Sequence, residues 1–190
     1  MDTDTIIIVS GLPRSGTSLM MQMLVAGGIP ALTDGIRQPD ESNPKGYHEL
    51  EAVKQTRKDG SWTRNAGGKC VKVVSLLLYD LPEDRQYRII FMTRSIDEIL
   101  ASQSAMLKAR GKQDGRTDEG MRESFNIHLT KLERRLAEQA NMSILYCDHS
   151  ELLKNPEQQA HRIEDFLECD LNIHAMVMAV DPTLHRQRKE

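Results

Sequence analysis

The sequence lacks an excess of positive charge, a long apolar run and a set of closely spaced cysteines. It carries 25 basic and 28 acidic residues, for a formal net charge of -3, and so has no overall positive field. Such a field holds nucleic acids and anionic membranes to a protein, and neither is therefore expected as a partner. Any anion that the protein binds must be held by a few local residues.

The sequence also shows no targeting segment. Its first apolar run, at residues 6–9, is short and follows an acidic start, whereas a signal peptide has a basic start and a longer run. No other run approaches the length of a membrane span. Cys70, Cys147 and Cys169 do not have the spacing of metal ligands, and two of them lie in apolar runs, which favours free thiols in a reducing interior. We therefore expect a cytoplasmic protein.

Short apolar strands alternate with amphipathic helices along the chain. Strands are predicted from β-branched and apolar content at residues 6–9, 70–75, 87–93 and 143–148. Helices are predicted from apolar periodicity and capping residues at 18–26, 50–58, 95–109 and 121–136, and from 156 onward. Such alternation indicates a parallel sheet with right-handed crossovers. The expected architecture is one α/β domain over residues 1–190, with three layers in which helices flank a parallel central sheet.

Residues 33–69 interrupt this alternation. They are rich in Asp, Asn, Pro, Gly and Lys, apart from the helix predicted at 50–58. Long excursions of this kind are often functional, and parallel sheets bind ligands beyond the carboxyl ends of their strands. We expect this segment to cover the active face.

The segment Gly-Leu-Pro-Arg-Ser-Gly-Thr-Ser, from Gly11 to Ser18, lies directly between the first predicted strand and the following helix. In that position backbone N–H groups and the helix N-terminus converge on a phosphate. The pattern indicates a phosphate-binding loop of the P-loop type, although a Gly-Pro turn that merely joins strand to helix uses similar residues.

The loop differs from that of the nucleoside triphosphatases. Those enzymes have Lys and then Ser or Thr after the second glycine, but Thr17 stands at the Lys position here. The positive charge must then come from Arg14, inside the loop. The third predicted strand runs into Arg94 rather than into an acidic residue that would help to hold Mg²⁺. No metal is therefore expected to take part in the chemistry.

The stretch from Leu12 to Ser18 resembles the 5′-phosphosulfate loop of the sulfotransferases that use 3′-phosphoadenosine-5′-phosphosulfate (PAPS), which have Pro-Lys/Arg-Ser-Gly-Thr in this place. In that family a strand ends in an Arg, and a Ser eight residues later joins it in binding the nucleotide 3′-phosphate. Arg94 and Ser102 have that spacing, which is a little over two helical turns. A guanidinium can grip a phosphate through two hydrogen bonds, although Arg94 taken alone would be an ordinary surface cation. The nucleotide-binding residues that the resemblance implies are Gly11, Pro13, Arg14, Ser15, Gly16, Thr17, Ser18, Arg94 and Ser102.

Two further stretches extend the resemblance, and two departures limit it. The sequence around Asn43 to Glu49 resembles the Asn-Pro-Lys-Gly-aromatic-x-Glu stretch of small bacterial sulfotransferases, and residues 180–186 resemble their C-terminal end. Cytosolic members carry a catalytic His in a Lys-Thr-His-Leu-Pro segment, but residues 72–77 read Lys-Val-Val-Ser-Leu-Leu. Their Arg-Lys-Gly loop for the 3′-phosphate is also missing. Only Arg186, Arg188 and Lys189 at the chain end correspond to it, and a solvated basic tail is the interpretation that we favour for them.

The resemblance implies an enzyme that moves the sulfuryl group of PAPS to a hydroxyl or amine of a small-molecule, carbohydrate or peptide acceptor. The product would be 3′-phosphoadenosine-5′-phosphate (PAP). Transfer needs a fixed nucleotide, cations around the moving group and a base near the acceptor. Arg14 is the predicted cation, and Lys45 or Lys72 could add a further charge.

For the base we predict Glu49, because the resemblance puts a Glu there, with His48 as the second candidate. If the segment is locally extended, Tyr47 and Glu49 share a side and His48 faces the other. A salt bridge between Glu49 and the region of Lys54 is the structural alternative for Glu49.

Two other functions fit parts of the sequence. One is a nucleotide or small-molecule kinase that uses ATP and Mg²⁺, against which Thr17 argues. The other is a nucleotide-binding protein that has kept the loop and lost its chemistry. Binding of PAP, compared with that of ADP and ATP without metal, distinguishes the three hypotheses.

Overall fold

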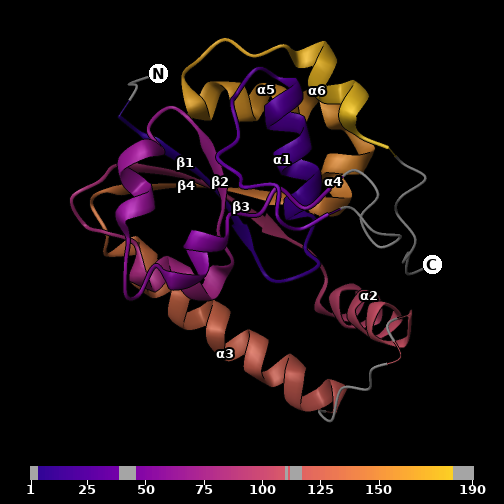
Figure 1. Cartoon of the computed structure of the whole chain (residues 1–190). Coiled ribbons are helices and arrows are strands. Elements are labelled where there is room, and N and C mark those ends of the chain that lie inside the picture. Colours follow the sequence, from indigo (N-terminus) through magenta and orange to yellow (C-terminus); the bar gives the residue numbers. More distant parts are fainter. Residues whose placement is uncertain (1–3, 39–45, 110, 112–116, 182–190) are drawn as a thin grey trace.

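The structure is a computed structural model that describes residues 4–38, 46–109, 111 and 117–181 of the chain. Four parallel strands form a sheet with the order β2-β1-β3-β4. They are β1 (Ile6–Gly11), β2 (Cys70–Lys72), β3 (Tyr87–Thr93) and β4 (Met142–Asp148). Helices cover both faces of the sheet (Figure 1). The predicted α/β class and the three layers around a parallel sheet are confirmed.

Helices α1 (Thr17–Ala26), α5 (Pro156–Leu167) and α6 (Ile173–Ala179) lie on one face of the sheet, the upper one in Figure 1. Side chains of a strand alternate between the two faces, so Ile7 and Val9 of β1 pack against the methionines of α1 on this side. Ile6 and Ile8 point to the opposite face. Because β1 is buried on both sides, it is apolar at consecutive positions, as is usual for a strand inside a parallel sheet.

The opposite face is covered by α3 (Asp118–Ala137) and by three short 3₁₀ helices. Leu132 and Leu136 of α3 share a buried core there with Trp62, from the segment that follows α1. The 3₁₀ helices are η1 (Glu51–Gln55), η2 (Ser61–Asn65) and η3 (Ser75–Asp80). This face therefore depends on irregular structure where the other face has regular helices.

Two predicted elements differ from the structure. The helix expected at 50–58 is the shorter 3₁₀ helix η1, where the hydroxyl of Thr56 donates to the carbonyl of Val53 and competes with helical hydrogen bonding. The strand expected at 70–75 ends at Lys72, since the chain turns into η3 and buries Ser75 and Leu78.

Two α-helices were not predicted. They are α6 and α4 (His149–Lys154), which begins directly after β4. The carboxylate of Asp148 caps α4 by accepting from the backbone N–H groups of Ser150 and Glu151. A strand-ending Asp followed by a short apolar pattern was the signal for α4.

The carboxyl ends of the strands meet at one edge of the sheet. Gly11 pairs with Met92, and Met92 pairs with Cys147 one strand further along. The segments that follow β1, β2, β3 and β4 therefore start close together, at the edge where parallel sheets bind ligands. Within the described ranges, no helix is both long and apolar enough to cross a membrane.

Candidate nucleotide-binding site

The loop between β1 and α1 requires glycine at both ends. Gly11 has a φ of 148°, and a Cβ added there would lie 2.6 Å from the carbonyl oxygen of Met92. Gly16 has a φ of 102°, and its Cβ would lie 2.5 Å from the Cδ2 atom of His149. Such distances leave no room for a side chain. The loop therefore runs close to β3 and to the start of α4, and the amino end of α1 opens at Gly16.

Two serine hydroxyls, one directly before this loop and one inside it, are buried. Ser10 is the next-to-last residue of β1 and Ser15 lies inside the loop, and both are almost fully buried. Within the part of the chain that the structure describes, neither hydroxyl oxygen has a hydrogen-bond partner. Buried polar atoms in proteins are nearly always hydrogen-bonded. Unsatisfied hydroxyls at a helix N-terminus are what a site for an anionic ligand would show.

Three predicted residues from distant parts of the sequence meet at Arg14. Its Nε donates to the hydroxyl of Ser102 at 3.0 Å, and its carbonyl oxygen accepts from Nη1 of Arg94 at 3.2 Å. Ser102 lies on α2 (Ile96–Ala109), which follows β3 and Arg94. Arg14 has a φ of 72°, a left-handed backbone conformation that is uncommon outside glycine. The two hydrogen bonds hold the loop in that conformation.

Arg94 is itself held in place. Its Nε donates to Oε2 of Glu98 at 2.8 Å, one helical turn along α2. Both side chains are largely buried, with 10% and 16% exposed. Its Nη1 also donates to the loop carbonyl of Arg14, so the guanidinium is fixed both to α2 and to the loop. The geometry thus presents Arg94 at the carboxyl end of β3 with a fixed orientation.

Lys72 supplies a second positive charge next to the loop. It ends β2, and its ammonium donates to the hydroxyl of Ser18 at 3.0 Å and to the carbonyl of Tyr47 at 3.1 Å. Burial lowers the pKa of Lys72 to about 8. The sequence offered Lys72 and Lys45 as equal candidates for this role, and the structure puts Lys72 beside α1. Lys45, Arg186, Arg188 and Lys189 lie outside the described residues.

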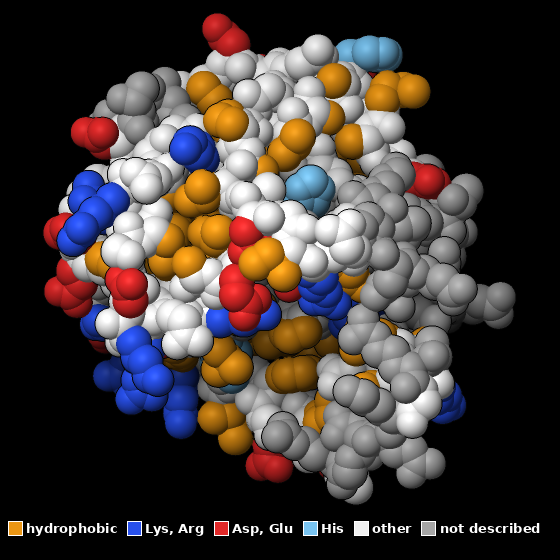
Figure 2. Space-filling view, in the orientation of Figure 1, with side chains coloured by type: hydrophobic (Ala, Val, Ile, Leu, Met, Phe, Trp, Pro, Cys, Tyr) orange, Lys and Arg blue, Asp and Glu red, His pale blue; other side chains and the backbone are white. Residues whose placement is uncertain are grey.

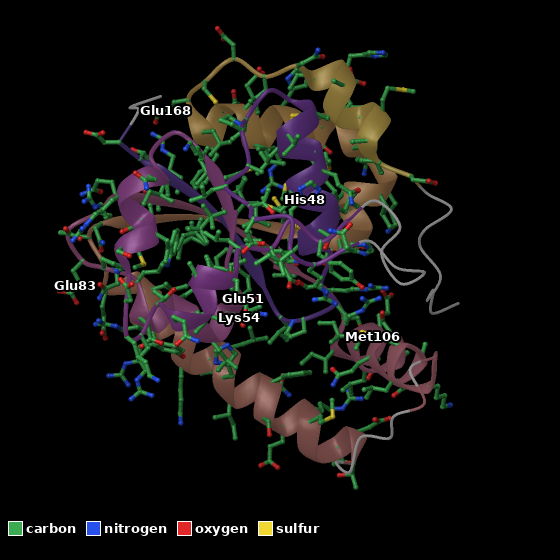
Figure 3. All side chains as sticks on the ribbon, viewed as in Figure 1. His48, Glu51, Lys54, Glu83, Met106 and Glu168 are labelled. Atoms are coloured by element: carbon green, nitrogen blue, oxygen red, sulfur yellow. The ribbon has the colours of Figure 1, made fainter. Side chains whose placement is uncertain are left out.

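Glu49 and Tyr47 share a partner. Arg37 donates from Nη1 to Oε1 of Glu49 at 2.7 Å, and its guanidinium lies 3.4 Å from the centre of the Tyr47 ring. Glu49 Oε1 is also 3.7 Å from Nζ of Lys72. The alternative pairing of Glu49 near Lys54 is not the one seen among the described residues, because Lys54 bonds to Glu51 at 2.6 Å, side by side in Figure 3.

His48 differs from the sequence-based expectation in its backbone. Its φ is 50°, in the left-handed region, so the segment is not locally extended as we had assumed. The side chain is half-buried, and burial lowers its imidazole pKa. Among the described residues, Nε2 of His48 has no hydrogen-bond partner. The lowered pKa favours the neutral ring, in which Nε2 can accept a hydrogen bond from an incoming donor.

One residue of the site was missed by the sequence analysis. His149 directly follows β4, is buried, and packs its ring against Gly16 of the loop. Its position after the carboxyl end of a predicted strand was the available signal. Among the described residues, no group of three His, Cys, Asp or Glu side chains could hold a metal ion.

Comparisons with known proteins establish the fold. No protein-family model matches the sequence, and no curated protein matches it. The structure is similar to the sulfotransferase domain from the curacin biosynthetic pathway, with a TM-score of 0.51 and 14% identity over 95% of this chain and 79% of that one. It is also similar to retinol dehydratase in complex with androsterone and the inactive cofactor PAP, with a TM-score of 0.50 and 17% identity. The latter match covers 94% of this chain and 64% of that protein, so this chain spans less than two thirds of its length. The protein has the sulfotransferase fold.

Proposed function

We propose that the protein is a sulfotransferase that uses PAPS and acts on a hydroxyl or amine of a small molecule. The observation that carries the proposal is the meeting of Arg14, Arg94 and Ser102 beside a glycine-flanked loop, in a fold shared with sulfotransferases. These residues come from the segments after β1 and β3. They supply two adjacent groups of phosphate-binding donors.

The donor set fits a nucleotide with phosphates on both the 3′ and 5′ sides of one ribose. The loop amides, the N-terminus of α1 and Lys72 bind the 5′-phosphosulfate. Arg94 and Ser102 bind the 3′-phosphate. The 3.0 Å hydrogen bond between Arg14 and Ser102 means that the two groups of donors adjoin, as a 3′,5′-bisphosphate requires. The unsatisfied hydroxyl of Ser15 gives the loop a further donor for the ligand.

When bound, PAPS supplies an activated sulfuryl group: the acceptor oxygen or nitrogen forms a bond to sulfur, and the bond from sulfur to the 5′-phosphate oxygen breaks. The chain's own residues act on the charges and the proton. Arg14 and Lys72 stabilise the negative charge that develops on the departing phosphate oxygen. A base removes the acceptor proton, and the products are PAP and a sulfated acceptor.

Glu49 is the proposed base, and His48 is the second candidate. Oε1 of Glu49 lies 3.7 Å from Nζ of Lys72, and Nζ of Lys72 donates to the hydroxyl of Ser18. Lys72 therefore connects Glu49 to the loop. Arg37 and Lys72 contact Oε1 of Glu49 and so fix the position of its carboxylate, which would accept the proton. His48 offers a neutral imidazole with an open Nε2, which is also able to accept one.

A thermal-shift panel tests the nucleotide. PAP should stabilise the protein without metal, by about 2.7 kcal/mol at a concentration one hundred times Kd, and well above AMP, ADP or ATP at equal concentration. A kinase would instead be stabilised most by ATP with Mg²⁺. Equal stabilisation by PAP and AMP would contradict the role of Arg94 and Ser102.

A further inference from the structure

A pocket of about 240 Å³ lies beside the phosphate-binding loop, between α2 and α3. Its lining consists of two loop residues, two residues of α2 and three of α3, namely Pro13, Arg14, Gln103, Met106, Met121, Ser124 and Phe125. Met106 lies on α2 across from the amino-terminal end of α3 (Figure 3). The face drawn in Figure 2 is hollowed just below its centre, with hydrophobic side chains at the floor of the hollow.

The pocket lies next to the side chains that we propose to donate hydrogen bonds to the phosphates. On α2, Glu98 and Ser102 are one turn apart and contact Arg94 and Arg14. Gln103 and Met106 form the neighbouring stripe of the same helix and line the pocket. One stripe of α2 therefore contacts the two arginines, and the adjacent stripe of the same helix lines the pocket.

The far wall of the pocket belongs to α3. Met121, Ser124 and Phe125 are spaced by three and four residues and therefore share one face of that helix. An ion pair between Arg122 of α3 and Asp97 of α2 ties the two helices together beside them. The wall is therefore attached to α2.

The lining selects by charge and size. Most of its side chains are apolar, and Arg14 is the one ionisable group among the described residues that line it. Without a carboxylate in that lining, a cationic ligand would lose hydration with no compensating partner. The volume is below the roughly 300–1,000 Å³ of pockets for drug-sized ligands, which suits a molecule of one or two rings. Two methionines and a phenylalanine provide adaptable and flat apolar contacts.

We infer that this pocket binds the sulfuryl acceptor and that the acceptor is a small, uncharged apolar or aromatic alcohol. Its hydroxyl faces Arg14, which lines the pocket and also belongs to the loop. This inference rests on the proposed function. A bound nucleotide with several phosphates fits the pocket less well, because Arg94 and Lys72 are not part of its lining.

Direct binding of 2-naphthol, followed by its fluorescence, tests the pocket independently of turnover. The wild-type protein should bind 2-naphthol with and without PAP, and should bind the cationic naphthalen-2-ylmethylamine at least about fivefold more weakly. Phe125→Ala should weaken 2-naphthol binding about tenfold, which corresponds to about 1.4 kcal/mol, by loss of an aromatic wall. Ile127→Ala is the matched control, since Ile127 lies on the same helix with 48% exposure and outside the lining.

The outcomes separate the pocket from the proposed function. Unchanged 2-naphthol affinity in Phe125→Ala, competition between 2-naphthol and PAP, or equal affinity for the cationic amine would each overturn the inference. Phe125→Leu, which removes the aromatic ring but keeps an apolar side chain, tests the loss of the aromatic wall if Phe125→Ala does not fold. Failure of PAP to bind while 2-naphthol binds normally would instead contradict the proposed function, and with it the assignment of the ligand as an acceptor.

Discussion

The phosphate-binding loop and the segment that carries Tyr47, His48 and Glu49 flank the same edge of the sheet but are held by different forces. The loop is shaped by its backbone, because Gly11 and Gly16 leave no space for a side chain and Ser15 is buried. The other segment is held by side chains, chiefly the partly exposed ion pair of Arg37 with Glu49. Backbone packing resists change, whereas exposed ion pairs contribute little to stability. Nucleotide binding should therefore be sensitive to substitutions that change the shape of the loop. The action of the base should be sensitive to substitutions that change the charge of its segment.

The largest expected effect is on turnover. Glu49→Gln keeps the shape of the side chain and removes its basicity, and should lower turnover by about 10²- to 10⁴-fold with nearly unchanged PAP affinity. His48→Asn should reduce turnover much less. Steady-state rates with a hydroxyl acceptor and PAP titrations of both variants give the comparison. An inactive His48→Asn variant beside an active Glu49→Gln variant would identify His48 as the base.

The next largest effect, on stability and on PAP binding, is expected from a substitution in the loop backbone. Gly11→Ala should reduce the free energy of unfolding by about 3 kcal/mol and abolish PAP binding, since the new Cβ meets a backbone carbonyl and the φ is positive. Gly28→Ala is the matched control, because Gly28 also has a positive φ, of 105°, but nothing within 4 Å of its Cβ. Its cost should be about 1 kcal/mol. Urea unfolding of both variants measures the difference, and equal losses would mean that close packing does not shape the loop.

Loss of either loop-side arginine should weaken PAP binding by roughly 1.5–3 kcal/mol, the range for hydrogen bonds to charged groups. The two variants should differ in selectivity. Arg94→Ala should bring the affinity for PAP down to that for AMP, whereas Arg14→Ala should weaken both ligands. Calorimetric titration with PAP and AMP checks this, and discrimination that survived in Arg94→Ala would show that Arg94 does not bind the 3′-phosphate.

A smaller effect, on the pH dependence of PAP affinity, is expected from Lys72, where the two regions meet. Because burial lowers its pKa to about 8, Lys72 is charged below pH 8 and loses its proton above it. PAP affinity should fall several-fold between pH 7 and pH 9, and Lys72→Met should remove that dependence. Stability responds in the opposite direction. Between about pH 8 and the ordinary lysine pKa of 10.5, the unfolded chain binds a proton that the folded one has lost, so this residue's contribution to stability rises with pH.

The smallest effect is expected for the ion pair that holds the Glu49 segment. Arg37→Ala should change the free energy of unfolding by less than about 1 kcal/mol, since both side chains are partly exposed to water. Arg134→Ala, which breaks the more exposed pair with Glu138, should be nearly neutral. Urea unfolding at low and high salt measures both. A loss of several kcal/mol for Arg37→Ala would place this segment among the rigid parts of the fold.

Much of the fold could be predicted because it is encoded locally. The four strands follow from short β-branched and apolar runs, and the loop follows from two glycines between a strand and a helix. The spacing of Arg94 and Ser102 also lies within one strand–helix unit. The 3₁₀ form of η1 and the turn after Lys72 were not predictable in this way, because short segments take the backbone geometry that their tertiary contacts allow.

The sequence by itself determined the local backbone of the loop and predicted that the loop, Arg14 and Arg94 bind an anion. Only the tertiary structure decided which others join them. His149 reaches Gly16, Lys72 reaches Ser18, and α3 closes a pocket beside Arg14 because the strand order and helix packing bring these segments to one edge. Periodic patterns encode the local backbone and the buried face of each element. They do not encode the distance between side chains from elements far apart in the sequence, which arises when the sheet assembles and its two cores pack.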